Sequence, residues 1–66
     1  MTTKKLTKAR REMLEDLEQN GPGYYVDYWE PVRWAIANSY IEEVKSRYRI
    51  TPAGLSALAA DRARTT

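Results

Sequence analysis

The stretch "SYIEEVKSRYRI", residues Ser39 to Ile50, decides the fold because it predicts a β-hairpin. Over residues 47–50, aromatic and aliphatic side chains alternate with arginines, as in a strand with one buried face. Residues 40–44 predict the partner strand, and Lys45-Ser46 predicts a two-residue turn. The turn contains neither Gly nor Asn, so the pattern does not define its type.

A helix is predicted directly after the hairpin, in "TPAGLSALAADRA", residues 51–63. Thr51 is placed to cap its N-terminus, and Pro52 stands at the first helical position, where a missing N–H costs nothing. Gly54 weakens the first turn by up to about 1 kcal/mol relative to alanine. The helical periodicity puts three residues on the buried face: Leu55, Leu58 and Ala59.

A further helix is predicted near the start of the chain, from about Lys8 to Gln19, with Thr7 as its N-cap. Its apolar residues recur at helical spacing: Leu6, Met13, Leu14 and Leu17. Asn20-Gly21 and the following proline end this helix.

Pro31 begins a second, short helix that is predicted to run to about Asn38. Its apolar stripe contains Val32, Ala35 and Ile36. The segment between the two helices, residues 23–30, is expected to be irregular or to contain one short strand.

The segment "WAIANSYIEEVKSRYRITPAGLSAL", Trp34 to Leu58, and the earlier "LTKARREMLEDLEQNG" resemble winged-helix domains. In that family a recognition helix is followed by a two-stranded wing and a closing helix. Ala35 and Ser39 fall on the leucine and glycine positions of the family pattern, and "YRITPAG" falls on the second wing strand and the start of the closing helix. The resemblance implies an α+β, winged-helix-like fold of three helices with a two-stranded β-hairpin wing, and it implies DNA binding.

The chain departs from the usual winged helix between the first helix and the recognition helix. Only residues 21–30 stand where the family places a full helix. The shortened middle region resembles that of small bacterial and prophage proteins. Within this organisation we expect a flexible basic arm at 1–6, a single domain at 7–63 and a frayed C-terminus at 64–66.

The composition excludes several classes of function. The 66 residues contain no Cys and no His, so disulfides, thiolate chemistry, the usual zinc ligand sets and the commonest general base are all absent. No catalytic motif and no Gly-rich phosphate loop is found. We therefore expect a non-enzymatic protein without metal or cofactor. There is no apolar signal region and no run of the roughly 18 apolar residues that span a bilayer, so we expect a cytoplasmic protein without membrane contact.

The resemblance implies that double-stranded DNA is the partner, bound by a regulatory or accessory protein of bacterial or phage type. The short recognition helix would present Arg33, Trp34 and Asn38 to base edges. One short helix reads few base pairs, so a dimer is expected. The basic residues of the wing and arm are expected to contact phosphates: Lys4, Lys5, Lys8, Lys45, Arg47 and Arg49.

Two less specific interpretations of these charges stay open at the sequence level. Arg33 lies one helical turn from Glu30 and can pair with it. Likewise, an arginine of the second strand can form a cross-strand ion pair with Glu42 or Glu43 on the first. The formal net charge is only +2, with the basic residues concentrated at both ends of the chain.

Five of the seven aromatic residues lie in "GPGYYVDYWEPVRW", residues 21–34: Tyr24, Tyr25, Tyr28, Trp29 and Trp34. Some of these rings must fill the core, and Trp29 is expected between the first helix and the hairpin. Five rings are more than a minimal core needs, and Tyr and Trp are enriched at the centres of protein interfaces. The alternative function is therefore a protein-interaction module that uses the surface of residues 24–34, for example a phage inhibitor of a host or defence protein, or a homodimer.

Overall fold

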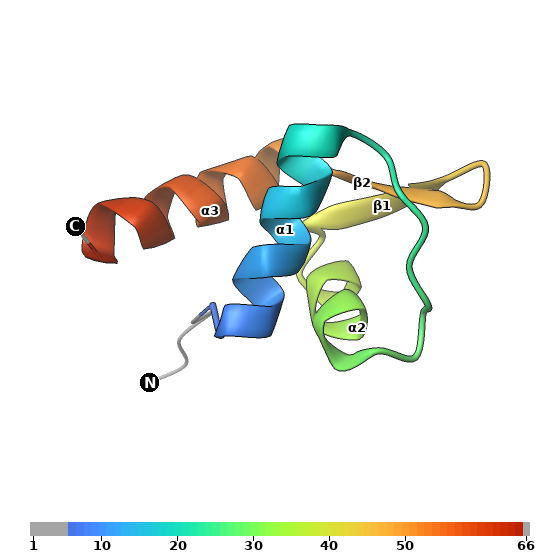
Figure 1. The fold of residues 1–66 in the computed structure, drawn as a ribbon, viewed down its shortest axis with the longest axis horizontal. Helices are drawn as coiled ribbons and strands as arrows, with labels where there is room; N and C mark the ends of the chain where they lie inside the picture. Colours follow the sequence, from blue (N-terminus) through green and yellow to red (C-terminus); the bar gives the residue numbers. More distant parts are fainter. Residues whose placement is uncertain (1–5, 66) are drawn as a thin grey trace.

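The computed structural model describes residues 6–65 and shows an α+β arrangement of three helices and one two-stranded antiparallel sheet within them. The elements are α1 (Lys8–Asn20), α2 (Glu30–Ala37), β1 (Ile41–Val44), β2 (Arg47–Ile50) and α3 (Pro52–Thr65). Their order and type confirm the sequence-based prediction. In Figure 1, α1 lies in the centre, with α3 on one side and with α2 and the hairpin on the other.

The predicted helix caps are present. The hydroxyl of Thr7 accepts a hydrogen bond from the backbone N–H of Arg10 at 3.3 Å. The hydroxyl of Thr51 accepts from the N–H of Gly54 at 3.1 Å and donates to the carbonyl of Ser39 at 2.6 Å. Thr51 therefore starts α3 and also ties it to the segment that precedes the hairpin.

The hairpin turn has left-handed backbone geometry at both of its residues. The φ angles of Lys45 and Ser46 are 53° and 68°, as a two-residue type I′ turn requires. This turn type matches the natural twist of the two strands, and Lys45 and Ser46 adopt it although Gly and Asn are the residues usually found there. The strands pair from Val44 with Arg47 at the turn to Ile41 with Ile50 at the base.

The connection between α1 and α2 joins the sheet at one point. The N–H and C=O of Gly23 exchange hydrogen bonds with the backbone of Tyr48 at 3.0 and 2.9 Å. The predicted irregular segment thus contains a single bridge rather than a strand. This bridge holds residues 22–24 against the outer edge of β2.

The hydrophobic core lies between α1, α2, α3 and the hairpin. Its buried members are Leu6, Met13, Leu14, Leu17, Val32, Ala35, Tyr40, Ile41, Tyr48 and Leu58. Complete burial of one of the larger aliphatic side chains stabilises the fold by about 1.5–3 kcal/mol. Leu6, which the sequence placed in the basic arm, is thus part of the domain, and α3 continues to Thr65 in the segment expected to fray.

The buried face of α3 differs from the prediction. Leu55 and Ala59 are exposed, and the buried positions are Gly54, Leu58 and Asp61. A Cβ at Gly54 would overlap the carbonyl oxygen of Tyr40, so the glycine allows α3 to lie directly on the backbone. This close approach turns Leu55 toward solvent.

Two predictions are also wrong, one for a residue of α2 and one for the residue that precedes this helix. Ile36 is exposed, because Val32 and Ala35 are the residues of this apolar stripe that enter the core, and the half-buried Trp34 packs against that core. Trp29 is not between α1 and the hairpin: it is 40% exposed and stacks on Tyr25 with ring centroids 5.9 Å apart. Trp29 is the residue before α2, and its ring packs on the loop residue Tyr25 rather than within the core.

Candidate nucleic-acid interface

The solvent face of the hairpin carries basic side chains. Arg47 and Arg49 alternate with the buried Tyr48 and the half-buried Ile50 along β2, and Lys45 stands in the turn that precedes this strand. The Nε of Arg49 donates to the Glu42 carboxylate at 2.5 Å across the hairpin. The predicted cross-strand ion pair is therefore confirmed for Arg49, and Lys45 and Arg47 supply the net positive charge of this face.

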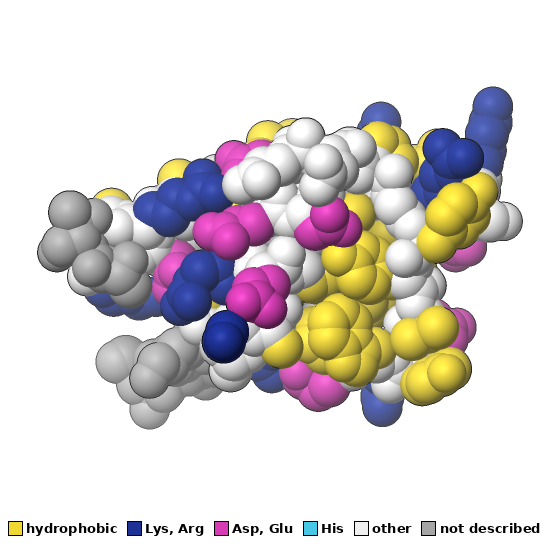
Figure 2. Space-filling model, in the orientation of Figure 1, with side chains coloured by type: hydrophobic (Ala, Val, Ile, Leu, Met, Phe, Trp, Pro, Cys, Tyr) yellow, Lys and Arg dark blue, Asp and Glu magenta, His cyan; other side chains and the backbone are white. Residues whose placement is uncertain are grey.

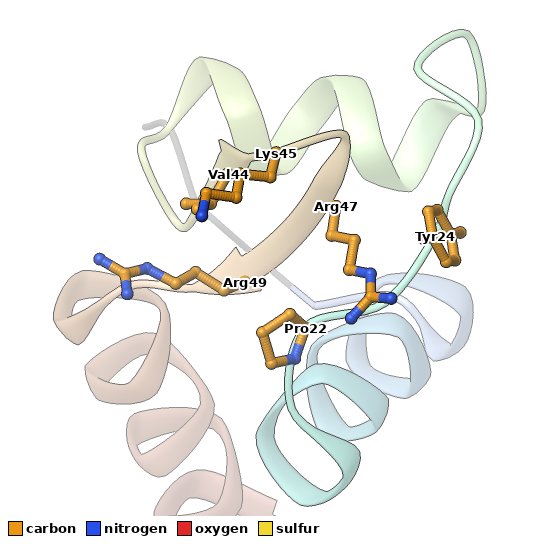
Figure 3. A pocket seen from close by; sticks show the side chains of 6 residues that line it. All are labelled: Pro22, Tyr24, Val44, Lys45, Arg47 and Arg49. Carbon is orange, nitrogen blue, oxygen red and sulfur yellow. The ribbon is translucent and has the colours of Figure 1, made fainter.

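A groove of about 380 Å³ lies between this face and the loop that follows α1 (Figure 3). Six residues line it: Pro22, Tyr24, Val44, Lys45, Arg47 and Arg49. The side chain of Arg47 reaches toward Pro22 and Tyr24, and its guanidinium lies 4.9 Å from the centre of the Tyr24 ring, over its face. The groove thus combines an aromatic and apolar wall with three cationic side chains.

Five of the seven arginines form ion pairs with acids within the fold. The ion pairs are Arg10–Glu30, Arg11–Asp61, Arg49–Glu42, Arg62 with Glu15 and Glu18, and Arg64–Asp61. Among residues 6–64, Lys45 and Arg47 form no ion pair with another described residue, and neither do Lys8 and Arg33. Of these four cations, only Lys45 and Arg47 line the groove.

Two other acidic residues of this region, Glu43 and Asp27, lie near Tyr48 on the core side of the hairpin. Glu43 stands directly across from Tyr48 in the strand register. Burial raises the pKa of Tyr48, and the carboxylates of Glu43 and Asp27 raise that pKa further. Negative charge is therefore placed near Tyr48, while the groove side remains basic.

The predicted base-reading residues of α2 differ in their availability. Arg33 is exposed. The Trp34 ring is half-buried beneath the Arg10 guanidinium, 4.5 Å from its centre, and the side-chain amide of Asn38 donates to the Trp34 carbonyl at 2.8 Å. The side chains of Trp34 and Asn38 are thus engaged within the fold.

Glu30, at the start of α2, pairs with Arg10 on α1 rather than with Arg33. The Arg10 guanidinium donates to both of its carboxylate oxygens, at 3.3 and 2.5 Å. These hydrogen bonds lower the pKa of Glu30. The proposed Arg33–Glu30 pair is not formed, because the packing of α1 on α2 brings a better-placed arginine to the same carboxylate.

Of the three lysines predicted to contact phosphates near the start of the chain, the structure describes only Lys8. Lys4 and Lys5 lie outside the described residues. Lys8 is exposed in the first turn of α1. That end of α1 and the C-terminal end of α3 lie on the side of the molecule away from the hairpin tip (Figure 1), so the described fold does not join Lys8 to the groove.

The five aromatic residues of the central stretch divide into two groups. Tyr25 and Trp34 are half-buried against the core. Tyr24 and Tyr28 are 70% and 78% exposed, and Trp29 is also outward-facing. Figure 2 shows hydrophobic side chains gathered over the part of this face where the loop and α2 lie, with charged side chains over α1 and α3.

Tyr25 fastens the loop to α1. Its hydroxyl donates to the Asp16 carboxylate at 2.7 Å, and the Asn20 amide donates to the other oxygen of the same group at 2.7 Å. These hydrogen bonds lower the pKa of Asp16. Burial, aided by Asp16, raises the pKa of Tyr25 to about 12. Tyr25, predicted as an interface residue, therefore has a structural contact.

Sequence reasoning missed Pro22 and Val44 as walls of the groove and assigned Tyr24 to a protein interface alone. The groove depends on the backbone pairing of Gly23 with Tyr48, two residues that no local pattern connects. The sequence contained one indication of an apolar wall: Val44 is an apolar residue on the strand face that it shares with Glu42.

Within residues 6–65, no cluster of acidic side chains has the arrangement of a metal site, and no helix has the length and apolar character needed to cross a membrane. Comparison of the chain with protein-family models, with curated proteins and with solved structures found no match.

Proposed function

We propose that this chain is a small, non-enzymatic, winged-helix-like protein that binds duplex DNA as a regulatory or accessory factor, with the β1–β2 hairpin as its wing. The observation that carries the proposal is the position of Lys45 and Arg47. Both are exposed, both line one groove, and neither forms an ion pair with a described acid.

Electrostatics supports contact with the sugar–phosphate backbone. Neutralisation of phosphates by Lys and Arg dominates the affinity of proteins for DNA. The hairpin projects from the body of the molecule (Figure 1), so its basic face is accessible to a long, rigid partner. Arg33 adds an exposed cation on α2. Since Trp34 and Asn38 are engaged within the fold, we expect backbone contacts to outweigh the reading of bases.

The test is a titration of labelled duplex DNA at several salt concentrations, followed by fluorescence anisotropy. We expect the logarithm of the affinity to fall linearly with the logarithm of the salt concentration, and Arg47→Gln to reduce this slope by about 1. Lys8→Gln is the matched control, because it removes one unpaired cation from the other side of the molecule. Absence of binding at low salt refutes the proposal, and an equal effect of both substitutions shows that the hairpin is not the contact site.

A second candidate function is protein interaction through the loop. Its support is the exposure of Tyr28 and Trp29, beside the exposed Val26, since exposed aromatic clusters are typical of protein interfaces. Sedimentation equilibrium of the wild type and of Tyr28→Ala/Trp29→Ala tests the homodimer. A dimer that the double variant abolishes supports this function, and a monomer at all concentrations rejects the homodimer.

A further inference from the structure

We propose that the groove between the hairpin and the loop binds an unpaired nucleotide of single-stranded DNA, with its base stacked on Tyr24 and its phosphates held by Lys45 and Arg47. The inference extends the proposed function and rests on the same basic hairpin. It adds a ligand with a flat aromatic group, which duplex DNA keeps within its own stack.

The apolar wall of the groove is the first argument. A contact with phosphates alone requires cations and has no use for Pro22, Tyr24 and Val44, which make up half of the lining residues. Single-stranded nucleic acids are bound by a basic groove that follows the backbone and by aromatic side chains on which the bases stack. The groove contains both components.

The placement of Tyr24 is the second argument. The preceding residue, Gly23, is fixed to β2 by two backbone hydrogen bonds with Tyr48. Arg47 lies over one face of the ring, a cation–π contact that holds the tyrosine beside the strand. Tyr24 remains 70% exposed, so its ring is held in position and is still accessible to a base.

Size and charge are the third argument. A volume of about 380 Å³ is near the lower end of the range of about 300–1,000 Å³ for small-molecule sites, which suits one nucleotide-sized group. The carboxylates of an acidic peptide would satisfy Lys45 and Arg47, but Asp and Glu side chains offer no planar ring to stack on Tyr24. A nucleotide with an unpaired base satisfies both the cations and the aromatic ring.

The experiment compares binding of labelled oligothymidylate and of a duplex of the same length by the wild type, Tyr24→Ala, Tyr24→Phe and Tyr28→Ala. We expect Tyr24→Ala to weaken binding of the single strand about tenfold or more, and Tyr24→Phe to retain it, because stacking needs the ring and not the hydroxyl. Tyr28→Ala is the matched control, since Tyr28 is an exposed tyrosine of the same loop that does not line the groove. Duplex affinity should change less than about twofold in all three variants.

The outcomes separate this inference from the proposed function. Duplex binding by the wild type without single-strand binding overturns the inference alone, and single-strand binding without duplex binding supports it while refuting the duplex proposal. Binding of neither refutes both. Equal losses for Tyr24→Ala and Tyr28→Ala, with circular dichroism spectra like that of the wild type, overturn the inference. So does displacement of the oligothymidylate by oligoglutamate as effectively as by unlabelled oligothymidylate, because recognition would then depend on charge alone.

Discussion

Arg11 on α1 and Asp61 on α3 form an ion pair at 2.8 Å that joins the two helices. Asp61 is 3% exposed and is the charged residue buried among residues 6–64. Arg11 also donates to the carbonyl of Leu6 at 3.3 Å. A single guanidinium therefore connects the start of the described chain, the first helix and the last helix.

Replacement of Arg11 by Met should destabilise the protein more than replacement of Asp61 by Asn. The first change removes the 2.8 Å guanidinium from a buried carboxylate that Arg64 approaches only to 3.7 Å; loss of a hydrogen bond by a buried acceptor costs about 1–3 kcal/mol. The second change leaves an arginine that can turn to solvent. Urea unfolding of both variants measures the difference, and a larger loss for Asp61→Asn would contradict this account.

Gly54→Ala should destabilise the fold although alanine is the better helix former. The new Cβ would overlap the Tyr40 carbonyl and lie 2.7 Å from the Ile50 side chain, and overpacking of this kind costs about 1–3 kcal/mol. Ala53→Gly, at the exposed neighbouring position, is the control and should cost only about 1 kcal/mol through helix propensity. Thermal unfolding compares the two; a stabilised Gly54→Ala would show that α3 does not pack as described.

The stability of the protein should fall in alkali because of Tyr25. The folded state raises the pKa of this phenol from 10.0 to about 12. Below pH 10 both states keep the proton and the stabilisation is complete. Between pH 10 and pH 12 the unfolded state loses the proton first, so the free energy of unfolding should decrease by on the order of 1–2 kcal/mol. Tyr25→Phe should show a shallower decrease over the same range in urea unfolding, and an unchanged slope would exclude Tyr25 as the cause.

The two tryptophans should differ in fluorescence. Trp29 is 40% exposed, whereas Trp34 is half-buried between Arg10 and the Tyr40 ring, whose centre lies 5.2 Å away. The Trp34→Phe variant, which keeps Trp29, should emit at longer wavelength and be quenched more readily by acrylamide than Trp29→Phe. If both indoles resist quenching in a monomer, the aromatic surface proposed for protein interaction is not exposed.

Elements that begin with a local signal were predictable. Thr7, Pro31 and Thr51 each act through residues within one helical turn, and all three stand at or next to the start of a helix as expected. The hairpin was predictable for the same reason, because its two strands are separated by only two residues.

Features that depend on contacts between distant segments were not predictable. Glu30 has Arg33 as a near neighbour in sequence, yet α1 brings Arg10 to it. The periodicity of α3 selects Leu55, but Gly54 and the Arg11–Asp61 pair determine which face is buried. The same holds for the candidate site. The basic residues of the hairpin could be identified from the sequence, whereas the groove could not, because it depends on the bridge between the distant residues Gly23 and Tyr48.

That bridge divides the connection between α1 and α2 into two parts. Gly23 attaches the first part to the hairpin, whereas the second part, with Tyr28 and Trp29, leads into α2. A residue inserted after Val26 would therefore shift Tyr28 and Trp29 while leaving Tyr24 beside β2. The two surfaces of this loop can consequently change in sequence independently of each other.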